Sequence, residues 1–390
     1  MPVINRVAEF TAEIAEWRRD IHTHPELLYD VERTAGKVAG LLRSFGVDEV
    51  VTGIGRTGVV AVIKGKNGGE GKVIGLRADM DALPVRERTG APYASQVDGK
   101  MHACGHDGHT AMLLGAARYL AETRNFDGTA VLIFQPAEEG GAGGRAMVED
   151  GLMERFGIEE VYGLHNLPGL PLGSISMRPG GTMASTDEFN ITIEGVGGHA
   201  AMPHNTHDPM IAAAHLIIAL QTVVSRNVDP LRSAVLSVTM ISGGDAFNII
   251  PRQIKLTGTI RARDDQVRDL AERRLREITD GVCKTFEVTG KIDYRHGYPV
   301  TVNTERETAF AANVAREVVG DERVDDNADG TMGGEDFAYM LKARPGAYIF
   351  LGNGDSSQLH SDTYDFNDEA IPVGVSYWAR LVEMALPARG

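Results

Sequence analysis

The sequence predicts a two-domain α/β protein: a large domain with a mostly parallel central sheet flanked by helices, interrupted by a smaller α+β domain of the ferredoxin-like type. Three observations predict this class. Apolar strand-like runs alternate with helical segments up to about residue 165 and again after residue 305, which is typical of parallel sheets. Residues 184–296 follow a β-α-β-β-α-β order. The 390 residues exceed the length of most single domains. We therefore expect a discontinuous large domain (1–183 and 297–390) with residues 184–296 inserted into it.

The first part of the large domain begins with helices. Apolar residues recur at helical spacing, and each helix ends at a residue that disfavours helix, Pro25 in one case and Gly46 in the other. Short apolar runs rich in valine and isoleucine then predict strands. The expected elements are helices at 5–22, 31–45 and 110–120, and strands at 58–64, 73–78, 129–135 and 161–164.

The inserted domain has strands of alternating polarity, as expected for sheets with one solvated face. Its first helix is apolar and its second is charged and amphipathic. An edge strand and the apolar helix are natural dimerisation surfaces, so we expect a homodimer formed through this domain. The expected elements are strands at 188–194, 234–242, 254–263 and 291–296, and helices at 208–226 and 264–286.

The chain then returns to the large domain, where helices are expected at 305–319 and 369–386 and a strand at 347–351. His360 follows this strand in the segment Leu359-His360-Ser361. His360 therefore offers one more candidate ligand ahead of the last helix.

The composition excludes several functions. A formal net charge of −15 and a pI near 5.3 argue against nucleic acid or an anionic membrane as partner. Two cysteines give no disulfide framework. Residues 1–10 lack a basic segment leading into an apolar one, and no run of about eighteen apolar residues is found. We therefore expect a cytoplasmic protein without a membrane span.

The segment His102-Ala103-Cys104-Gly105-His106-Asp107-Gly108-His109 concentrates metal-binding groups ahead of a helix. Cys104 and His106 are two residues apart and can point the same way, and thiolate with imidazole suits zinc or another borderline metal. The alternative is that the segment only caps the helix, with Asp107 as N-cap.

Strand ends supply further candidate ligands. Asp81 follows the strand at 73–78, Glu138 and Glu139 follow the strand at 129–135, and His165 follows the strand at 161–164. Asp81 is expected to orient a metal-bound histidine, although a solvated turn is also possible. If the backbone is extended there, Glu138 and Glu139 point to opposite sides, so that one can bind metal while the other faces substrate.

Taken together, these motifs closely resemble the aminoacylase and carboxypeptidase-like family of co-catalytic metallohydrolases, specifically the subfamily with hippurate hydrolase and the auxin-conjugate amidohydrolases. The resemblance covers essentially the whole chain. It is carried by HPEL at His24, RADMDALP from Arg77, HACGHDGH from His102, QPAEEG from Gln135, GLHN from Gly163, GGHAAMPH from Gly197, NIIP from Asn248, GGEDF from Gly333 and LHS from Leu359.

The resemblance implies two divalent metal ions, zinc or manganese. Cys104 would bridge them, with His106 and His165 on one metal and Glu139 and His360 on the other. Glu138 would be the catalytic carboxylate. Asp79 stands where other relatives have a ligating histidine, so it is not assigned to the metal, and Asp81 keeps its orienting role by analogy only.

The resemblance also assigns roles to the inserted domain, which would act as a lid. His199 would reach the partner subunit's active site and stabilise the oxyanion. Asn248 and Arg261 would bind the substrate's α-carboxylate. The alternatives are a turn residue for Asn248 and a surface strand arginine for Arg261.

The function implied is metal-dependent hydrolysis of the amide bond of N-acyl amino acids, such as benzoyl, acetyl or indole-acetyl conjugates, to a carboxylic acid and a free amino acid. The nearest alternative is a dipeptidase or carboxypeptidase on the same scaffold. An alternative of another class is a metal-loaded binding or sensing protein without catalysis. The presence of Glu138 and of every expected ligand weighs against this last alternative.

Overall fold

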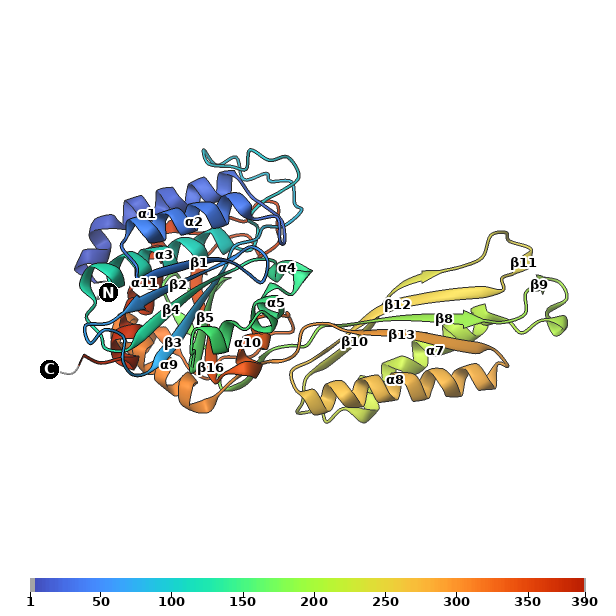
Figure 1. Cartoon of the computed structure of the whole chain (residues 1–390). Helices are drawn as coiled ribbons and strands as arrows, with labels where there is room; N and C mark the ends of the chain where they lie inside the picture. Colours follow the sequence, from blue (N-terminus) through green and yellow to red (C-terminus); the bar gives the residue numbers. More distant parts are fainter. Residues whose placement is uncertain (1–3, 389–390) are drawn as a thin grey trace. The chain divides into compact units, whose positions relative to one another are not determined.

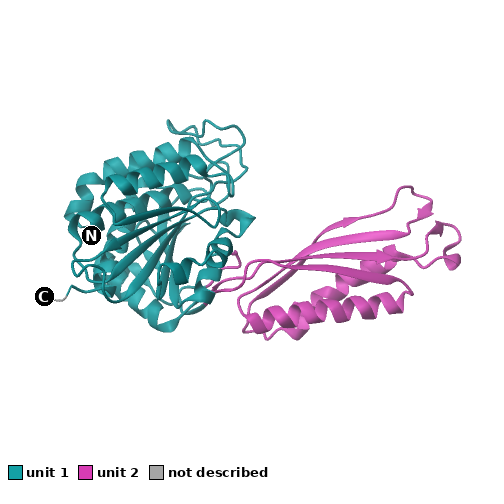
Figure 2. Ribbon diagram, viewed as in Figure 1, with its two compact units in different colours: residues 1–180, 302–329, 336–390 teal, residues 181–301, 330–335 magenta. Residues whose placement is uncertain are grey.

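A computed structural model describes residues 4–388, so the outermost residues of the predicted segments 1–183 and 297–390 lie outside the description. The chain divides into two compact units (Figure 2). Unit 1 comprises residues 1–180, 302–329 and 336–390, and unit 2 comprises residues 181–301 and 330–335. Unit 2 therefore extends beyond the predicted 184–296 and takes in a segment expected in the large domain. Backbone hydrogen bonds explain this, because Thr331 N donates to Thr182 O and Ala184 N donates to Gly333 O.

Unit 1 is built on an eight-stranded sheet of order β1-β2-β4-β3-β5-β16-β6-β15 (Figure 1). The four central strands β4, β3, β5 and β16 are parallel, while β1 and β2 extend one edge antiparallel. Buried valine, isoleucine and leucine form the central strands, as expected of a sheet covered on both faces. The strands are β1 (Glu49–Ile54), β2 (Gly58–Lys64), β3 (Val73–Asp79), β4 (Thr129–Gln135), β5 (Glu160–Pro168), β6 (Ile175–Ser176), β15 (Val324–Asp325) and β16 (Gly346–Gly354).

The helices of unit 1 complete its layers. The helix starting at His106 is almost wholly buried and shares one hydrophobic core with the sheet and with the helices that start at Asn5, Glu305 and Ile371. Gly115 allows close packing there, since a Cβ at this position would stand 2.6 Å from Ile14 Cδ1 and 2.8 Å from Val375 Cγ2. The helices are α1 (Asn5–Thr23), α2 (Glu32–Ser44), α3 (His106–Thr123), α4 (Glu138–Gly141), α5 (Gly143–Glu149), α6 (Leu152–Arg155), α9 (Glu305–Val319), α10 (Ala338–Ala343) and α11 (Ile371–Ala385).

Unit 2 has the predicted β-α-β-β-α-β order. Its antiparallel sheet has the strand order β10-β12-β8-β13, in which the first and third strands of the motif are central, and this is the ferredoxin-like arrangement. The elements are β8 (Asp187–Glu194), α7 (Pro209–Thr222), β10 (Ala234–Ser242), β12 (Gln253–Ala262), α8 (Asp265–Thr285) and β13 (Thr289–His296). A shorter paired strand of this unit is β9 (Gly198–His199) with β11 (Ile249–Ile250), and β7 (Gly180–Met183) pairs with β14 (Thr301–Asn303), each of which contains the point in the sequence where one unit ends and the other begins.

Helix α7 continues as a π-helix over Val223–Asn227. The combined helix Pro209–Asn227 has 19 residues and a mean hydropathy of 1.4, so by length and composition it is long and apolar enough to cross a membrane. The sequence pattern had predicted no such segment. Ala212, Leu216 and Leu220 are buried in the core of unit 2. The apolar character of the helix is therefore explained in part by packing inside a folded unit.

Candidate metal centre

The five predicted ligands of unit 1 lie together beyond the carboxyl ends of the central strands. Cys104 lies in the loop before α3, His106 opens α3, Glu139 lies in α4, His165 lies in β5, and His360 lies in the loop after β16. Cys104 Sγ is 3.4 Å from His165 Nε2, and Glu139 Oε1 is 3.4 Å from His360 Nε2 and 3.9 Å from His106 Nε2. Two candidate ligand triads, Cys104-His106-His165 and Cys104-Glu139-His360, share the cysteine. This geometry suits two ions with one bridging ligand.

Unsatisfied polar atoms show that this cluster fits cations. His106 Nδ1 donates to Asp81 O at 2.8 Å, and His165 Nδ1 donates to Asn166 O at 2.6 Å, so each imidazole presents Nε2 to the cluster. His106 Nε2 and Glu139 Oε1 are buried and have no hydrogen-bond partner among residues 4–388. Leaving such groups buried and unpaired is costly. The arrangement is therefore explained by metal ions that accept these lone pairs.

The electrostatics of the cluster favour positive charge. Burial, together with Glu139 and Glu138, raises the pKa of the Cys104 thiol well above its usual value. Burial opposes protonation of His106, but Asp79 and Asp81 outweigh it and raise the pKa of this imidazole to about 10. Carboxylates therefore dominate the local field, and a thiolate at Cys104 requires a cation beside it.

The two glutamates lie on a tight turn, so the prediction of an extended backbone at Glu138 and Glu139 is wrong. Ala137 and Ala142, on either side, both have φ of 55°, in the left-handed region. The Asp81 carboxylate holds the turn, accepting from Glu138 N at 2.9 Å on one oxygen and from Glu139 N at 3.1 Å on the other. The turn, rather than strand alternation, therefore sets the directions of the two side chains.

Asp81 is only 1% exposed, so its alternative description as a solvated turn is wrong. Its backbone oxygen bonds His106 Nδ1, whereas its carboxylate stands 3.7 Å from that atom. Any orientation of His106 by Asp81 therefore comes mainly through the backbone, and the carboxylate serves the glutamate turn.

His109 belongs to a buried hydrogen-bond chain that the sequence did not reveal. His109 Nδ1 donates to Asp79 Oδ1 at 2.7 Å, and Asn166 N donates to His109 Nε2 at 2.9 Å. The other oxygen of Asp79 accepts from Arg77 Nη1 at 2.7 Å. His109 and Asp79 are therefore satisfied without a metal. The available signal was the three-residue spacing from His106, which places both histidines on one helix face.

Asn166 and Tyr364 extend this chain around the ligands. Asn166 Nδ2 donates to Cys104 O at 2.7 Å, and Tyr364 Oη donates to Asn166 Oδ1 at 2.7 Å. Gly105 makes the approach possible, because its φ is +88° and a Cβ there would collide with Asn166 Nδ2. The ligand strand β5, the Cys104 loop and the loop containing Tyr364 are thus tied together by one side chain.

Asp107 is not a helix cap, so that alternative for the histidine-rich segment is wrong. The N-cap of α3 is Gly105, and the Asp107 carboxylate binds His22 Nδ1 at 2.8 Å. Burial opposes the charge on His22, but Asp107 outweighs it and raises the pKa of His22 to about 9. Arg18 Nη1 lies 3.4 Å from the same carboxylate. The buried side chains of Arg18 and His22 therefore bind Asp107 in the first turn of α3.

The predicted residues of unit 2 are described within that unit alone. His199 pairs with Ile249 in the β9–β11 ladder, and Ala200 N donates to Asn248 O at 3.0 Å, so the structure brings His199 and Asn248 together. Arg261 lies on β12 opposite Val235. Among the described residues it has no hydrogen bond or ion pair, and burial lowers its pKa. An arginine that is partly desolvated and unpaired is suited to binding an anion.

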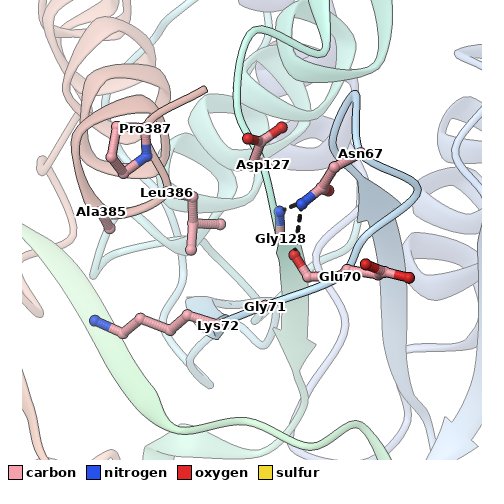
Figure 3. A pocket seen from close by; sticks show the side chains of 9 residues that line it. All are labelled: Asn67, Glu70, Gly71, Lys72, Asp127, Gly128, Ala385, Leu386 and Pro387. Atoms are coloured by element: carbon pink, nitrogen blue, oxygen red, sulfur yellow. Dashed lines mark hydrogen bonds between the residues drawn. The ribbon is translucent and has the colours of Figure 1, made fainter. Parts of the chain in front are cut away.

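A surface pocket of about 300 Å³ lies elsewhere on unit 1 (Figure 3). Gly71 and Lys72 precede β3, and Gly128 precedes β4, so the pocket lies at the amino ends of strands whose carboxyl ends carry the ligands. In Figure 3 the Asn67 side chain hydrogen-bonds the backbone of Glu70 and Gly128, so it stabilises the loops that line the pocket. The pocket is therefore separate from the candidate metal centre.

A shared candidate cysteine, candidate imidazole and carboxylate ligands, and a second glutamate beside one of them are typical of the class of metal-dependent hydrolases. The chain belongs to the family described as Peptidase family M20/M25/M40, whose model matches residues 75–384. The predicted membership is therefore confirmed, and the chain is a metal-dependent amidohydrolase.

Individual relatives agree. The chain is 43% identical over 381 residues to hippurate hydrolase from Campylobacter jejuni, covering 98% of each chain. It is 42% identical over 362 residues to N-acetyl-L-cysteine deacetylase from Bacillus subtilis, covering 93% of this chain and 85% of that protein. Its fold matches the crystal structure of the Bacillus subtilis YXEP protein, described as a dinuclear metal-binding peptidase of the M20 family, with a TM-score of 0.86 and 33% identity over 97% of this chain and 99% of that one.

Proposed function

We propose that the protein hydrolyses the amide bond of N-acyl amino acids and releases a carboxylic acid and a free amino acid. The observation that supports this proposal is the turn held by Asp81, in which Glu139 lies near the other candidate ligands and Glu138 directly precedes it. Relatives named for hippurate and for N-acetyl-L-cysteine support this substrate class.

Two divalent ions, zinc or manganese, would be held by Cys104, His106, Glu139, His165 and His360. When bound, they supply Lewis acidity toward water and the scissile carbonyl. Glu138 takes a proton from the attacking water and returns it to the leaving amine. A carboxylate that is buried among these groups and is left out of the assigned ligand set suits this exchange.

Side chains of unit 2 are assigned to the substrate. Arg261, which has no ion pair with any described residue, and Asn248 bind the substrate's α-carboxylate. His199, whose side chain is exposed beside Asn248, stabilises the oxyanion in the partner subunit's site. These roles require a homodimer.

Unit 2 offers surfaces for this dimer. Met210, Ile211 and Ile218 of α7 are exposed, as are Met240 and Ile241 of the edge strand β10. Large apolar side chains on an unpaired edge are characteristic of association sites. We assign the enzyme to the cytoplasm, with no nucleic acid or membrane partner, in keeping with its negative net charge of −15.

The rival function is cleavage of dipeptides on the same scaffold. The test is to strip the protein with chelator, resupply zinc or manganese, and measure release of amino acid from N-benzoyl, N-acetyl and indole-acetyl amino acids beside plain dipeptides. Metal-dependent release from acylated substrates alone is expected. Preference for dipeptides would favour the rival, and no release from any substrate by metal-loaded protein would favour a non-catalytic binding protein.

A further inference from the structure

Leu28 has an unusual backbone and an unusual exposure for a leucine. Its φ is +50°, in the left-handed region that bulky residues rarely adopt. Its side chain is 40% exposed, and among the described residues of unit 1 only Val302 is a comparably exposed large apolar residue. Strain of this kind persists where the surroundings impose it, and it often marks a functional position.

The neighbours of Leu28 place it beside the glutamate turn. Leu28 O accepts from Ala137 N at 3.1 Å, directly before Glu138. A Cβ built on Gly141 would stand 3.6 Å from Leu28 Cδ2, so the leucine side chain leans against the end of the turn. Tyr29 Oη donates to Gly141 O at 2.7 Å and fixes the same contact from the next residue.

Gly140, in the same turn, lies next to unfilled space. A Cβ built on Gly140, between Glu139 and Gly141, would meet no atom within 4 Å. The preceding residue Leu27 forms a bridge with Ala82, next to Asp81. Leu28 is therefore held between the segment that contains Asp81 and the glutamate turn, and its apolar side chain is partly exposed there.

We propose that Leu28 is a specificity-determining residue that contacts the acyl group of the substrate and favours apolar, aromatic acyl groups over acetyl. This inference rests on the proposed function. The α-carboxylate is assigned to Asn248 and Arg261 of unit 2, whereas Leu28 adjoins Glu138 in unit 1. The half of the substrate that remains for Leu28 is the acyl half, and an apolar side chain recognises it by removing its carbon surface from water.

Two substitutions test this. Leu28→Gly removes the side chain and adopts the positive φ without strain, so folding is preserved. Leu28→Asn tolerates the same backbone and keeps a similar size but is polar. In metal-loaded full-length protein, kcat/KM is measured for N-benzoylglycine and N-acetylglycine. The benzoyl-to-acetyl ratio is expected to fall at least about tenfold in both variants, the lower end of what a single methylene contributes in an apolar pocket.

Val302→Ala is the matched control, since it shortens the other exposed large apolar residue among the described residues of unit 1. Its ratio should stay at the wild-type value. A Leu28 ratio that is unchanged or rises would overturn the proposal, as would equal losses on both substrates, which indicate a structural role. Failure of the wild-type protein to hydrolyse these two substrates and every other N-acyl amino acid of the panel above would instead refute the proposed function.

Discussion

The substitution Asp81→Asn distinguishes two roles of a buried carboxylate: holding the turn that contains Glu138 and Glu139, and orienting His106. Both oxygens accept backbone N–H groups, from Glu138 at 2.9 Å and Glu139 at 3.1 Å. An amide can accept at only one position and turns its NH₂ group toward the other N–H. The loss of one charge-assisted bond and the unpaired donor left behind together cost about 2–4 kcal/mol. The thermal midpoint should fall by several degrees. Displacing the turn by about 1 Å should lower kcat about a hundredfold.

The assay combines kcat on an N-acyl amino acid, metal content and thermal unfolding. The control is Asp30→Asn, because Asp30 is an exposed aspartate two residues after Leu28. This variant should match the wild type. Normal kcat and an unchanged midpoint for Asp81→Asn would refute the idea that this carboxylate holds the glutamate turn. Loss of metal without loss of stability would point instead to orientation of His106, whose Nδ1 lies 3.7 Å from the carboxylate.

Three further outcomes are expected. Glu138→Gln should keep both metals yet lose at least about a hundredfold in kcat; near-normal turnover by metal-replete protein would contradict its role as base. Arg261→Ala should raise KM for substrates with a free α-carboxylate but not for their methyl esters, and equal KM values in variant and wild type would exclude the carboxylate contact. The pKa of His22 is raised from 6.5 to about 9 in the folded protein, so its pairing with Asp107 stabilises fully below about pH 6.5 and is lost as pH rises through 9. Thermal midpoints should therefore fall more steeply over this interval in the wild type than in His22→Gln, and parallel slopes would contradict the pairing.

The sequence was most informative where local pattern decides structure. The strands β2 and β4 and the helix α9 begin and end where their apolar patterns predict. The edge strand β1 was missed because its side chains are mostly exposed or half-buried and carry no strong pattern. The two-residue strands β6 and β15 exist only through pairing with distant partners, which no local pattern encodes.

The same division applies to the site. Residue types and spacing were enough to select Cys104, His106, Glu139, His165 and His360, which the structure brings together. The turn that directs Glu138 depends on Asp81, 57 residues earlier, and the role of His109 depends on Asn166, also 57 residues away. Hydrogen bonds over such separations follow from the tertiary fold, so sequence spacing could not predict them.

The discontinuous path of unit 1 has a consequence for synthesis of the protein. Strand β5 pairs with β16, so that Val161 lies opposite Gly346, although all residues of unit 2 lie between them in the sequence. Most of unit 2, residues 181–301, leaves the ribosome before its remaining segment 330–335 and before β16, so β5 waits for a neighbour made much later. His360 emerges later still. The nascent chain therefore holds an incomplete set of candidate ligands until His360, which follows β16, has been made, and hydrolytic activity should appear only after nearly all of the chain has been made.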